Sequence, residues 1–81
     1  VYYMVQDNSM QGARIMKNDL ALVFLTDSIR DKDIVLFSYK SNTYIRRYKA
    51  ITDNMVVLFP ENPDYDTLAI DKKDIKIAGK V

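Results

Sequence analysis

The sequence predicts a small, mostly β domain built from about seven short strands. Its apolar residues fall in short runs rich in Val, Ile, Tyr and Phe, and clusters of polar turn residues separate these runs at fairly regular spacing. The 81 residues suffice for one domain with a modest core. No apolar run approaches the ~20 residues of a membrane span, so no membrane contact is expected.

Strands are expected where runs of β-branched and aromatic residues lie between turn clusters. In chain order they cover Tyr2–Gln6, Leu20–Leu25, Asp33–Tyr39, Thr43–Tyr48, Met55–Phe59, Leu68–Ile70 and Ile75–Val81. No internal repeat or linker interrupts this order, which favours a single unit over residues 1–81.

The earlier connections contain one candidate helix and one candidate tight turn. Ser9–Ile15 is expected to form a short helix with Ser9 near its start. Ser41-Asn42 is expected to make the tight turn of a hairpin between the third and fourth strands, although neither residue is glycine. Asn18 and Asn42 are the expected positions of positive φ, because asparagine tolerates that conformation better than most residues.

The later connections are polar. Thr52-Asp53-Asn54 is expected to turn between the fourth and fifth strands. Pro60-Glu61-Asn62-Pro63 is excluded from regular strand, since its two prolines remove hydrogen-bond donors from a ladder. Asp71-Lys72-Lys73-Asp74 favours a polar turn or a single helical turn.

The composition excludes several kinds of site. The chain has no cysteine and no histidine, which removes disulfides, thiolate zinc sites and Ser-His-Asp chemistry. Its acidic residues, Asp7 among them, show no metal-loop spacing and are interpreted as turn residues, so neither a metal nor another cofactor is expected. Lys and Arg number 12 and Asp and Glu 11, for a net charge of +1. An autonomous nucleic-acid-binding domain is usually far more basic.

The most informative motif is Asn8-Ser9-Met10, which ends the first expected strand and precedes the small residues Gly12-Ala13. Taken alone, a serine in this position is most simply the N-cap of a helix. Further motifs follow in order: Met16–Asp19, Asp31–Val35, Ile45-Arg46-Arg47-Tyr48, Leu58–Tyr65 and Ile75–Val81. Their order and spacing are more specific than any one of them.

This ordered set resembles the LexA family of self-cleaving proteins, which includes LexA, the phage CI-type repressors and the UmuD mutagenesis proteins. The resemblance covers nearly the whole chain and implies a compact, mostly β fold with a Ser-Lys dyad. Ser9 matches the nucleophile, and the backbone N–H groups of Asn8 and Ser9 match the oxyanion hole. Arg46 matches the general base, which in the family is the lysine of a Val-Lys-Arg motif, and Arg47 matches the arginine after it.

Arginine at position 46 removes the expected base. Burial can lower the pKa of a lysine far enough to leave a neutral amine near pH 7, whereas making an arginine neutral there costs roughly 9 kcal/mol. A charged guanidinium also has no acceptor atom for the serine proton. Strand alternation places Lys49 on the opposite face from Arg46, and Lys40 is expected to be exposed before the hairpin turn. Ser9 is therefore expected to lack a base.

The resemblance implies the C-terminal dimerisation and regulatory domain of a transcriptional repressor that does not cleave itself. Its N-terminal helix-turn-helix domain, absent from residues 1–81, would bind the operator DNA, and no scissile Ala-Gly or Cys-Gly pair precedes Ser9. The expected partners are a second copy and a RecA filament or an antirepressor. The two-fold interface is expected to involve largely the C-terminal part of the domain, with Ile75-Lys76-Ile77 pairing along a sheet edge. The expected location is the cytoplasm.

Two other functions remain open. The domain is a working autopeptidase if another lysine serves as the base, or if the arginine was introduced to trap an uncleaved state. Alternatively, it is a small β-barrel that binds nucleic acid, because the stripe Tyr44–Lys49 interleaves aromatic and basic side chains. The near-neutral net charge argues against the second of these.

Overall fold

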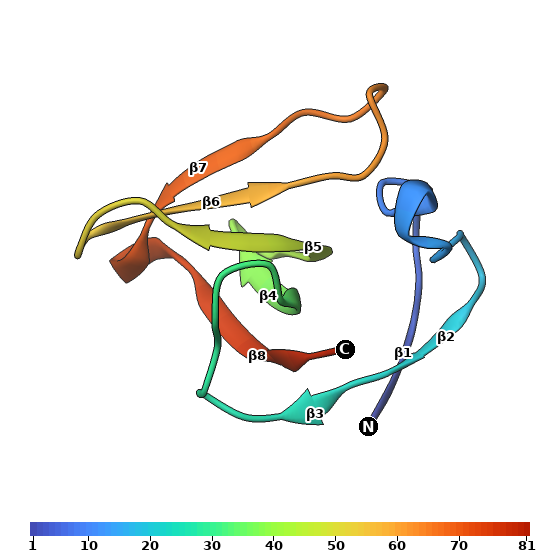
Figure 1. Ribbon diagram of the computed structural model, residues 1–81. Helices are drawn as coiled ribbons and strands as arrows, with labels where there is room; N and C mark the ends of the chain where they lie inside the picture. The colour runs from blue at the N-terminus through green and yellow to red at the C-terminus, as the bar shows by residue number, and fades with distance from the viewer.

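A computed structural model describes the whole chain, Val1 to Val81, and confirms the mostly β class. Eight strands form two antiparallel sheets, and two short 3-10 helices lie between strands (Figure 1). The strands are β1 Tyr2–Met4, β2 Leu20–Leu22, β3 Phe24–Leu25, β4 Ile34–Tyr39, β5 Asn42–Ala50, β6 Met55–Phe59, β7 Leu68–Asp71 and β8 Lys76–Lys80, and the 3-10 helices are η1 Gln11–Ala13 and η2 Lys72–Asp74. Neither helix has the length that a membrane crossing needs.

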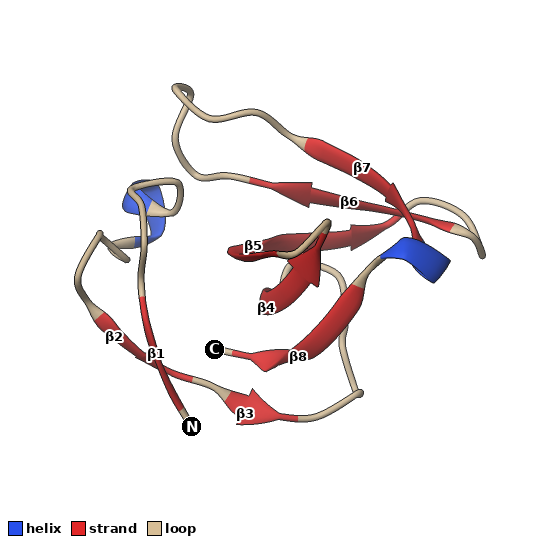
Figure 2. Cartoon of the chain, turned by 180° about the vertical axis from the view of Figure 1, so that it is seen from behind, coloured by secondary structure: helices blue, strands red, loops and turns tan.

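The two sheets differ in size. The larger has the strand order β3-β8-β4-β5-β6-β7, and β1 pairs with β2 in a sheet of two strands. Figure 2 shows η1 at one end of the small sheet, on the side of the loop that follows β6. This arrangement brings the segment after β1 close to the middle of the large sheet.

The predicted strand Leu20–Leu25 is two strands in the structure. Leu20–Leu22 pairs with β1, whereas Phe24–Leu25 pairs with β8 in the other sheet. Val23, at the change of sheet, is buried and exchanges two hydrogen bonds with Val1, of 2.7 and 2.9 Å. The continuous apolar run concealed this break, because a change of sheet at a single residue leaves the composition of the run unchanged.

The hairpin between β4 and β5 turns one residue earlier than predicted. Tyr39 pairs with Asn42, so Lys40 and Ser41 form the two-residue connection. Both have positive φ, of 48° and 67°, as a type I′ turn requires. The expectation for Asn42 was therefore wrong, whereas Asn18 does have a positive φ, of 76°.

The two helical segments are both single turns. η1 is shorter than the predicted Ser9–Ile15 helix, and its N-cap residue is Met10, with no side-chain cap. Ser9 is therefore not a helix cap. η2 matches the helical turn expected at Asp71–Asp74, and the Asp71 side chain accepts a hydrogen bond from the Lys73 N–H at 3.0 Å, which is the usual way to satisfy a first-turn donor.

The C-terminal strand β8 lies within the large sheet instead of along its edge. β4 pairs with it on one side over Lys76–Lys80, and β3 pairs with Gly79 and Lys80 on the other. Glycine is needed at position 79, because a Cβ there would lie 2.1 Å from the Phe24 carbonyl oxygen. Residues 76–78 of β8 have no β3 partner, so only this part of the strand has an open edge.

The core consists of two clusters that meet at β5. The larger joins strands of the large sheet and contains Val35, Phe37, Tyr48, Val56, Leu58 and Ile70. The smaller contains Val5, Met10, Ala21 and Ile45. Since each fully buried side chain of this size stabilises the fold by roughly 1.5–3 kcal/mol, the smaller cluster holds the segment that flanks Ser9 firmly against β5.

Candidate functional site at Ser9 and Arg46

Ser9 lies in the segment between β1 and η1, and the core holds it there. Met10, the next residue, is fully buried, and Ser9 itself has no exposed surface. The Ser9 carbonyl accepts a hydrogen bond from the Glu61 N–H, and the Gly12 N–H donates to the Glu61 carbonyl, both at 2.8 Å. A Cβ on Gly12 would lie 2.6 Å from that carbonyl oxygen, so glycine permits this close approach of the two loops.

Arg46 comes from β5 and reaches Ser9. One of its terminal nitrogens donates to the Ser9 hydroxyl at 2.5 Å and to the Ile45 carbonyl at 2.9 Å. The residue is only 5% exposed. The structure thus brings together two residues that lie 37 positions apart and that the sequence singled out.

Other groups around the guanidinium are aromatic and acidic. The Asp7 carboxylate lies 3.9 Å from the nitrogen that binds Ser9. The Tyr44 and Tyr65 rings lie 5.3 and 5.8 Å from the guanidinium carbon, within the range of a cation–π contact. The Nε atom is buried and has no hydrogen-bond partner. The site therefore holds a positive charge that its neighbours stabilise only in part.

The Ser9 hydroxyl has a donor beside it and no base. A guanidinium carries only donors, so the contact with Arg46 uses a lone pair of the Ser9 oxygen and cannot remove its proton. An activated serine needs a neighbour that accepts that proton. The side-chain contact observed at the Ser9 hydroxyl is therefore one with a donor.

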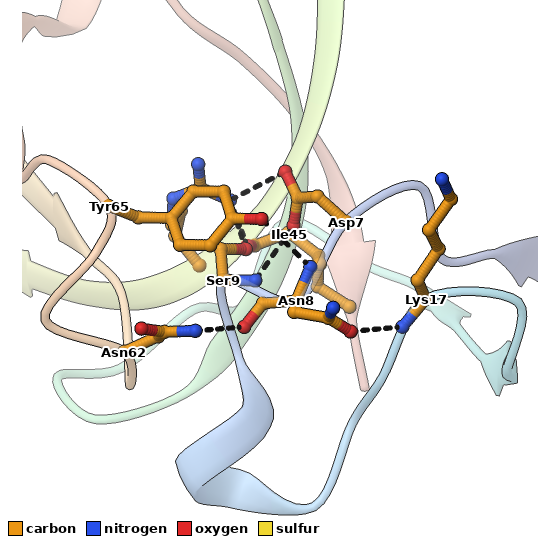
Figure 3. Close-up of polar contacts among 8 residues, drawn as sticks. Asp7, Asn8, Ser9, Lys17, Ile45, Asn62 and Tyr65 are labelled. Atoms are coloured by element: carbon orange, nitrogen blue, oxygen red, sulfur yellow. Dashed lines mark hydrogen bonds and ion pairs between the residues drawn. The ribbon is translucent and has the colours of Figure 1, made fainter.

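The backbone N–H groups of Asn8 and Ser9 both have acceptors within the chain (Figure 3). The Ser9 N–H donates to the Asp7 carboxylate at 2.9 Å, and the Asn8 N–H donates to the Tyr65 hydroxyl at 3.3 Å. Neither Asp7 nor Tyr65 was predicted to belong to the site. Asp7 lies two residues before the N–H group from which it accepts a hydrogen bond, which is the spacing of an Asx turn. The sequence alone could have indicated this contact.

The side chain of Asn8 and the loop that carries Tyr65 complete the enclosure. The Asn8 side-chain oxygen accepts from the Lys17 N–H at 3.0 Å, and Asn62 donates to the Asn8 carbonyl at 2.9 Å (Figure 3). The Asn8 carbonyl shares a peptide plane with the Ser9 N–H, so its hydrogen bond with Asn62 helps to fix the direction of that N–H.

Tyr3 is the titratable group whose pKa shifts clearly near this site. Burial raises the pKa of the Tyr3 hydroxyl above its ordinary value, the negative charge of Asp7 raises it further, and the positive charge of Arg46 opposes both. Tyr3 therefore stays neutral to a higher pH than a free tyrosine. This shift places Tyr3 within the electrostatic reach of the Asp7–Arg46 pair.

No lysine replaces Arg46 at Ser9. Lys40 and Lys49 are both exposed, and β5 pairs with β4 and β6 without a register shift, so no bulge turns Lys49 inward. Arg47 makes different contacts, since it donates to the Glu61 carboxylate and to the Lys32 carbonyl, both at 2.7 Å. It thereby holds the loop after β6 against β5.

The stripe Tyr44–Lys49 does not form a continuous exposed surface. Arg46 and Tyr48 are buried, and Arg47 is paired with Glu61. Single-stranded nucleic acid is bound by aromatic and basic groups that are open to solvent. The structure thus gives no support to the nucleic-acid-binding alternative at this strand.

Comparison with protein-family models identifies the family of the chain. The family model for Peptidase S24-like proteins matches residues 1–81, the whole chain. The chain belongs to the Peptidase S24-like family. Within that family the S24-like chain carries serine at position 9 and arginine at position 46, which the fold brings into hydrogen-bond contact.

The similar curated proteins are LexA repressors. The S24-like chain is 34% identical to that of Saccharophagus degradans over 71 residues, which are 86% of this chain and 35% of the relative. It is 33% identical to that of Teredinibacter turnerae over 75 residues, 91% of this chain and 38% of the relative. For that of Petrotoga mobilis the identity is 33% over 78 residues, 95% of this chain and 38% of the relative. The chain thus spans well under half of these proteins.

Proposed function

We propose that residues 1–81 form the C-terminal dimerisation and regulatory domain of a LexA-type transcriptional repressor, and that this domain does not cleave itself. Its similarity to LexA repressors over 83 to 95% of its length supports the first part. The contact from the Arg46 guanidinium to the Ser9 hydroxyl carries the second. A repressor acts on the chromosome, so the proposal places the protein in the cytoplasm, with operator DNA bound by a separate N-terminal domain.

The energetic basis is the protonation state of the group beside Ser9. Making an arginine neutral at pH 7 costs roughly 9 kcal/mol, and the Asp7 carboxylate lies 3.9 Å from the guanidinium as its ion-pair partner. The Ser9 hydroxyl therefore keeps its proton. Regulation would then depend on partners, for which a RecA filament and an antirepressor are the two candidates, instead of on self-cleavage.

The test replaces the guanidinium with an amine. Arg46→Lys should place a proton acceptor at Ser9, because a partly desolvated lysine has a lowered pKa. The variant and the original chain would each be incubated at pH 7 to 10 with a peptide that bears an Ala-Gly bond. We expect slow cleavage by the variant, faster as the pH rises, and none by the original chain.

Arg30→Lys is the matched control, because Arg30 is exposed and its side chain takes part in no hydrogen bond or ion pair within the chain. It should leave the chain inactive. If the original chain cleaved the peptide as fast as Arg46→Lys does, the proposal would be contradicted, since Arg46 would then not occupy the position of the base. In that case the working autopeptidase is the better description of the chain.

An exposed apolar surface is the candidate interface of the proposed dimer. Large apolar side chains are exposed along the small sheet and β3, at Tyr2, Met4, Leu20, Leu22, Phe24 and Leu25. The pairing Tyr2–Leu22 and Met4–Leu20 puts the first four on one face of the small sheet. Contiguous exposed apolar surface of this kind is characteristic of an interface. The edge of β8 at residues 76–78 is the smaller alternative.

A further inference from the structure

We propose that Asp7 and Tyr65 close the site from within, each occupying one of the two backbone N–H groups that would hold an oxyanion. This inference rests on the function proposed above and adds a second barrier to it. The first barrier is the missing base at position 46. The second concerns the Ser9 and Asn8 N–H groups and not the Ser9 hydroxyl.

Asp7 resembles an oxyanion in both charge and position. One oxygen of its carboxylate accepts the Ser9 N–H at 2.9 Å, and the other lies 3.9 Å from the Arg46 nitrogen. An oxyanion hole works by placing donors 2.7–3.1 Å from the site where negative charge develops. The Asp7 carboxylate already fills that site with a negative charge of its own.

The Tyr65 hydroxyl binds the second backbone donor, the Asn8 N–H. Its hydroxyl accepts the Asn8 N–H at 3.3 Å, a longer and weaker contact than that of Asp7. Two hydrogen bonds hold its loop in place, from Asn62 to the Asn8 carbonyl at 2.9 Å and from the Glu61 N–H to the Ser9 carbonyl at 2.8 Å. The Tyr65 ring also lies 5.8 Å from the guanidinium carbon. Tyr65 thus contributes a weaker closure from a different loop (Figure 3).

The complete burial of Ser9 follows from this enclosure. A carbonyl group that is to be attacked must reach the Ser9 hydroxyl and receive both N–H groups at once. In the present arrangement it must first displace the Asp7 carboxylate and the Tyr65 hydroxyl. Restoring the base alone should therefore restore little reactivity.

The test measures the reaction of Ser9 with a fluorophosphonate in the full 81-residue chain. In this reaction the Ser9 oxygen bonds to phosphorus, fluoride leaves, and the introduced amine takes the hydroxyl proton. Labelling would be followed by intact mass at pH 9 in four chains: R46K, R46K/D7A, R46K/Y65F and R46K/D7A/Y65F. We expect R46K to react slowly and R46K/D7A about tenfold faster or more, because one oxyanion donor is worth about 10²–10³ in rate. R46K/Y65F should gain less, and the triple variant should be fastest.

R46K/D7N separates occupancy of the N–H from loss of charge. Removing the Asp7 charge also lowers the pKa of a nearby amine and would by itself favour reaction. Asparagine removes the charge but keeps an oxygen that can accept the Ser9 N–H. R46K/D7N should therefore react much more slowly than R46K/D7A. D64A and Y2F in the R46K background control for loss of an exposed carboxylate and of an exposed tyrosine hydroxyl, respectively.

A second measurement does not depend on reactivity. In D7A, the Ser9 amide should lose its hydrogen bond, which amide NMR would report as an upfield proton shift and faster hydrogen exchange. In D7N both should stay close to the original values. The spectra also verify that each variant is folded.

The outcomes separate the two proposals. If R46K reacts as fast as R46K/D7A/Y65F, Asp7 and Tyr65 do not obstruct the oxyanion hole, and the proposed closure is wrong. An unreactive but folded triple variant, or an equally fast R46K/D7N, would also overturn it. If the chain with Arg46 intact reacts as fast as R46K, the proposed function fails instead, because some other group already activates Ser9.

Discussion

At the scale of single residues, the proposed function depends on the arginine at position 46. Lysine and arginine are both cationic and of similar length, but only lysine can lose its proton near neutral pH. The buried guanidinium keeps an unpaired Nε atom, which is unfavourable in a core. Its other contacts, with Ser9, Ile45 and two tyrosine rings, offset that burial.

Tyr3 gives a pH-dependent prediction at the same scale. Its pKa is raised in the folded chain, mainly by burial. Below the pKa of a free tyrosine, about 10, Tyr3 is neutral in both the folded and the unfolded chain, so its ionisation does not make stability depend on pH. As the pH rises beyond that value the unfolded chain ionises first, so the free energy of unfolding falls.

The measurement is urea unfolding between pH 9 and 11 for the original chain and Tyr3→Phe. We expect the original chain to lose stability more steeply with pH than Tyr3→Phe, which has no hydroxyl to ionise. Tyr2→Phe is the control, because Tyr2 is 71% exposed, and it should keep the steeper loss. Parallel curves for the original chain and Tyr3→Phe would contradict the prediction.

At the scale of elements, glycine at position 79 lets β8 lie close against β3. Gly79→Ala would place a Cβ 2.1 Å from the Phe24 carbonyl oxygen, and backbone atoms cannot yield as a flexible side chain can. We expect a loss of about 1–3 kcal/mol, the usual range for overpacking, together with separation of β3 from β8.

Urea unfolding measures the loss of stability in Gly79→Ala, and hydrogen exchange of the β3 amides reports the separation. Ala78→Ser, at the exposed neighbouring position, should change stability by less than about 0.5 kcal/mol. Equal effects of the two substitutions would mean that the packing of β3 on β8 is looser than the backbone geometry requires.

The β4–β5 hairpin shows why element boundaries were harder to predict than elements. Pairs such as Phe37–Tyr44 and Leu36–Ile45 define the register across the hairpin, and this register leaves Lys40 and Ser41 as the turn. Neither residue is common at positive φ. The packing of the strands overrode the local preference that favoured Asn42, because a shift by one residue would turn every side chain to the other face.

At the scale of the whole molecule, the exposed apolar face of the small sheet and β3 predicts a homodimer. Sedimentation at increasing concentration should show association of the original chain. Leu20→Glu should weaken that association at least tenfold, because it places a charge among Tyr2, Met4 and Leu22 where an interface would desolvate it.

Ile51→Glu is the matched control, because Ile51 is a comparably exposed apolar residue, at 54%, between β5 and β6. It should leave the association unchanged. A chain that stays monomeric to high micromolar concentration would contradict the dimer. An unaltered dimer in Leu20→Glu would move the interface elsewhere, with the open part of β8 as the next candidate.

The sequence by itself predicted the mostly β class, seven strand regions that overlap all eight strands of the structure, and the two residues that meet at the site. Runs of β-branched and aromatic residues report strands because their spacing reflects burial of nearby positions. The ordered motifs pointed to Ser9 and Arg46, and arginine chemistry predicted without any coordinates that position 46 supplies no base. The contact between Asp7 and the Ser9 N–H was also within reach of the sequence, since it spans two residues.

Only the tertiary structure decided how that site is enclosed. Tyr65 meets Asn8 across 57 positions, and no local pattern encodes which loop will cover which backbone group. The same holds for the change of sheet at Val23 and for the place of β8 between β3 and β4. Such contacts depend on the path of every intervening strand. Burial of Ser9 and occupation of the Asn8 N–H by Tyr65 are therefore properties of the folded chain and not of its motifs.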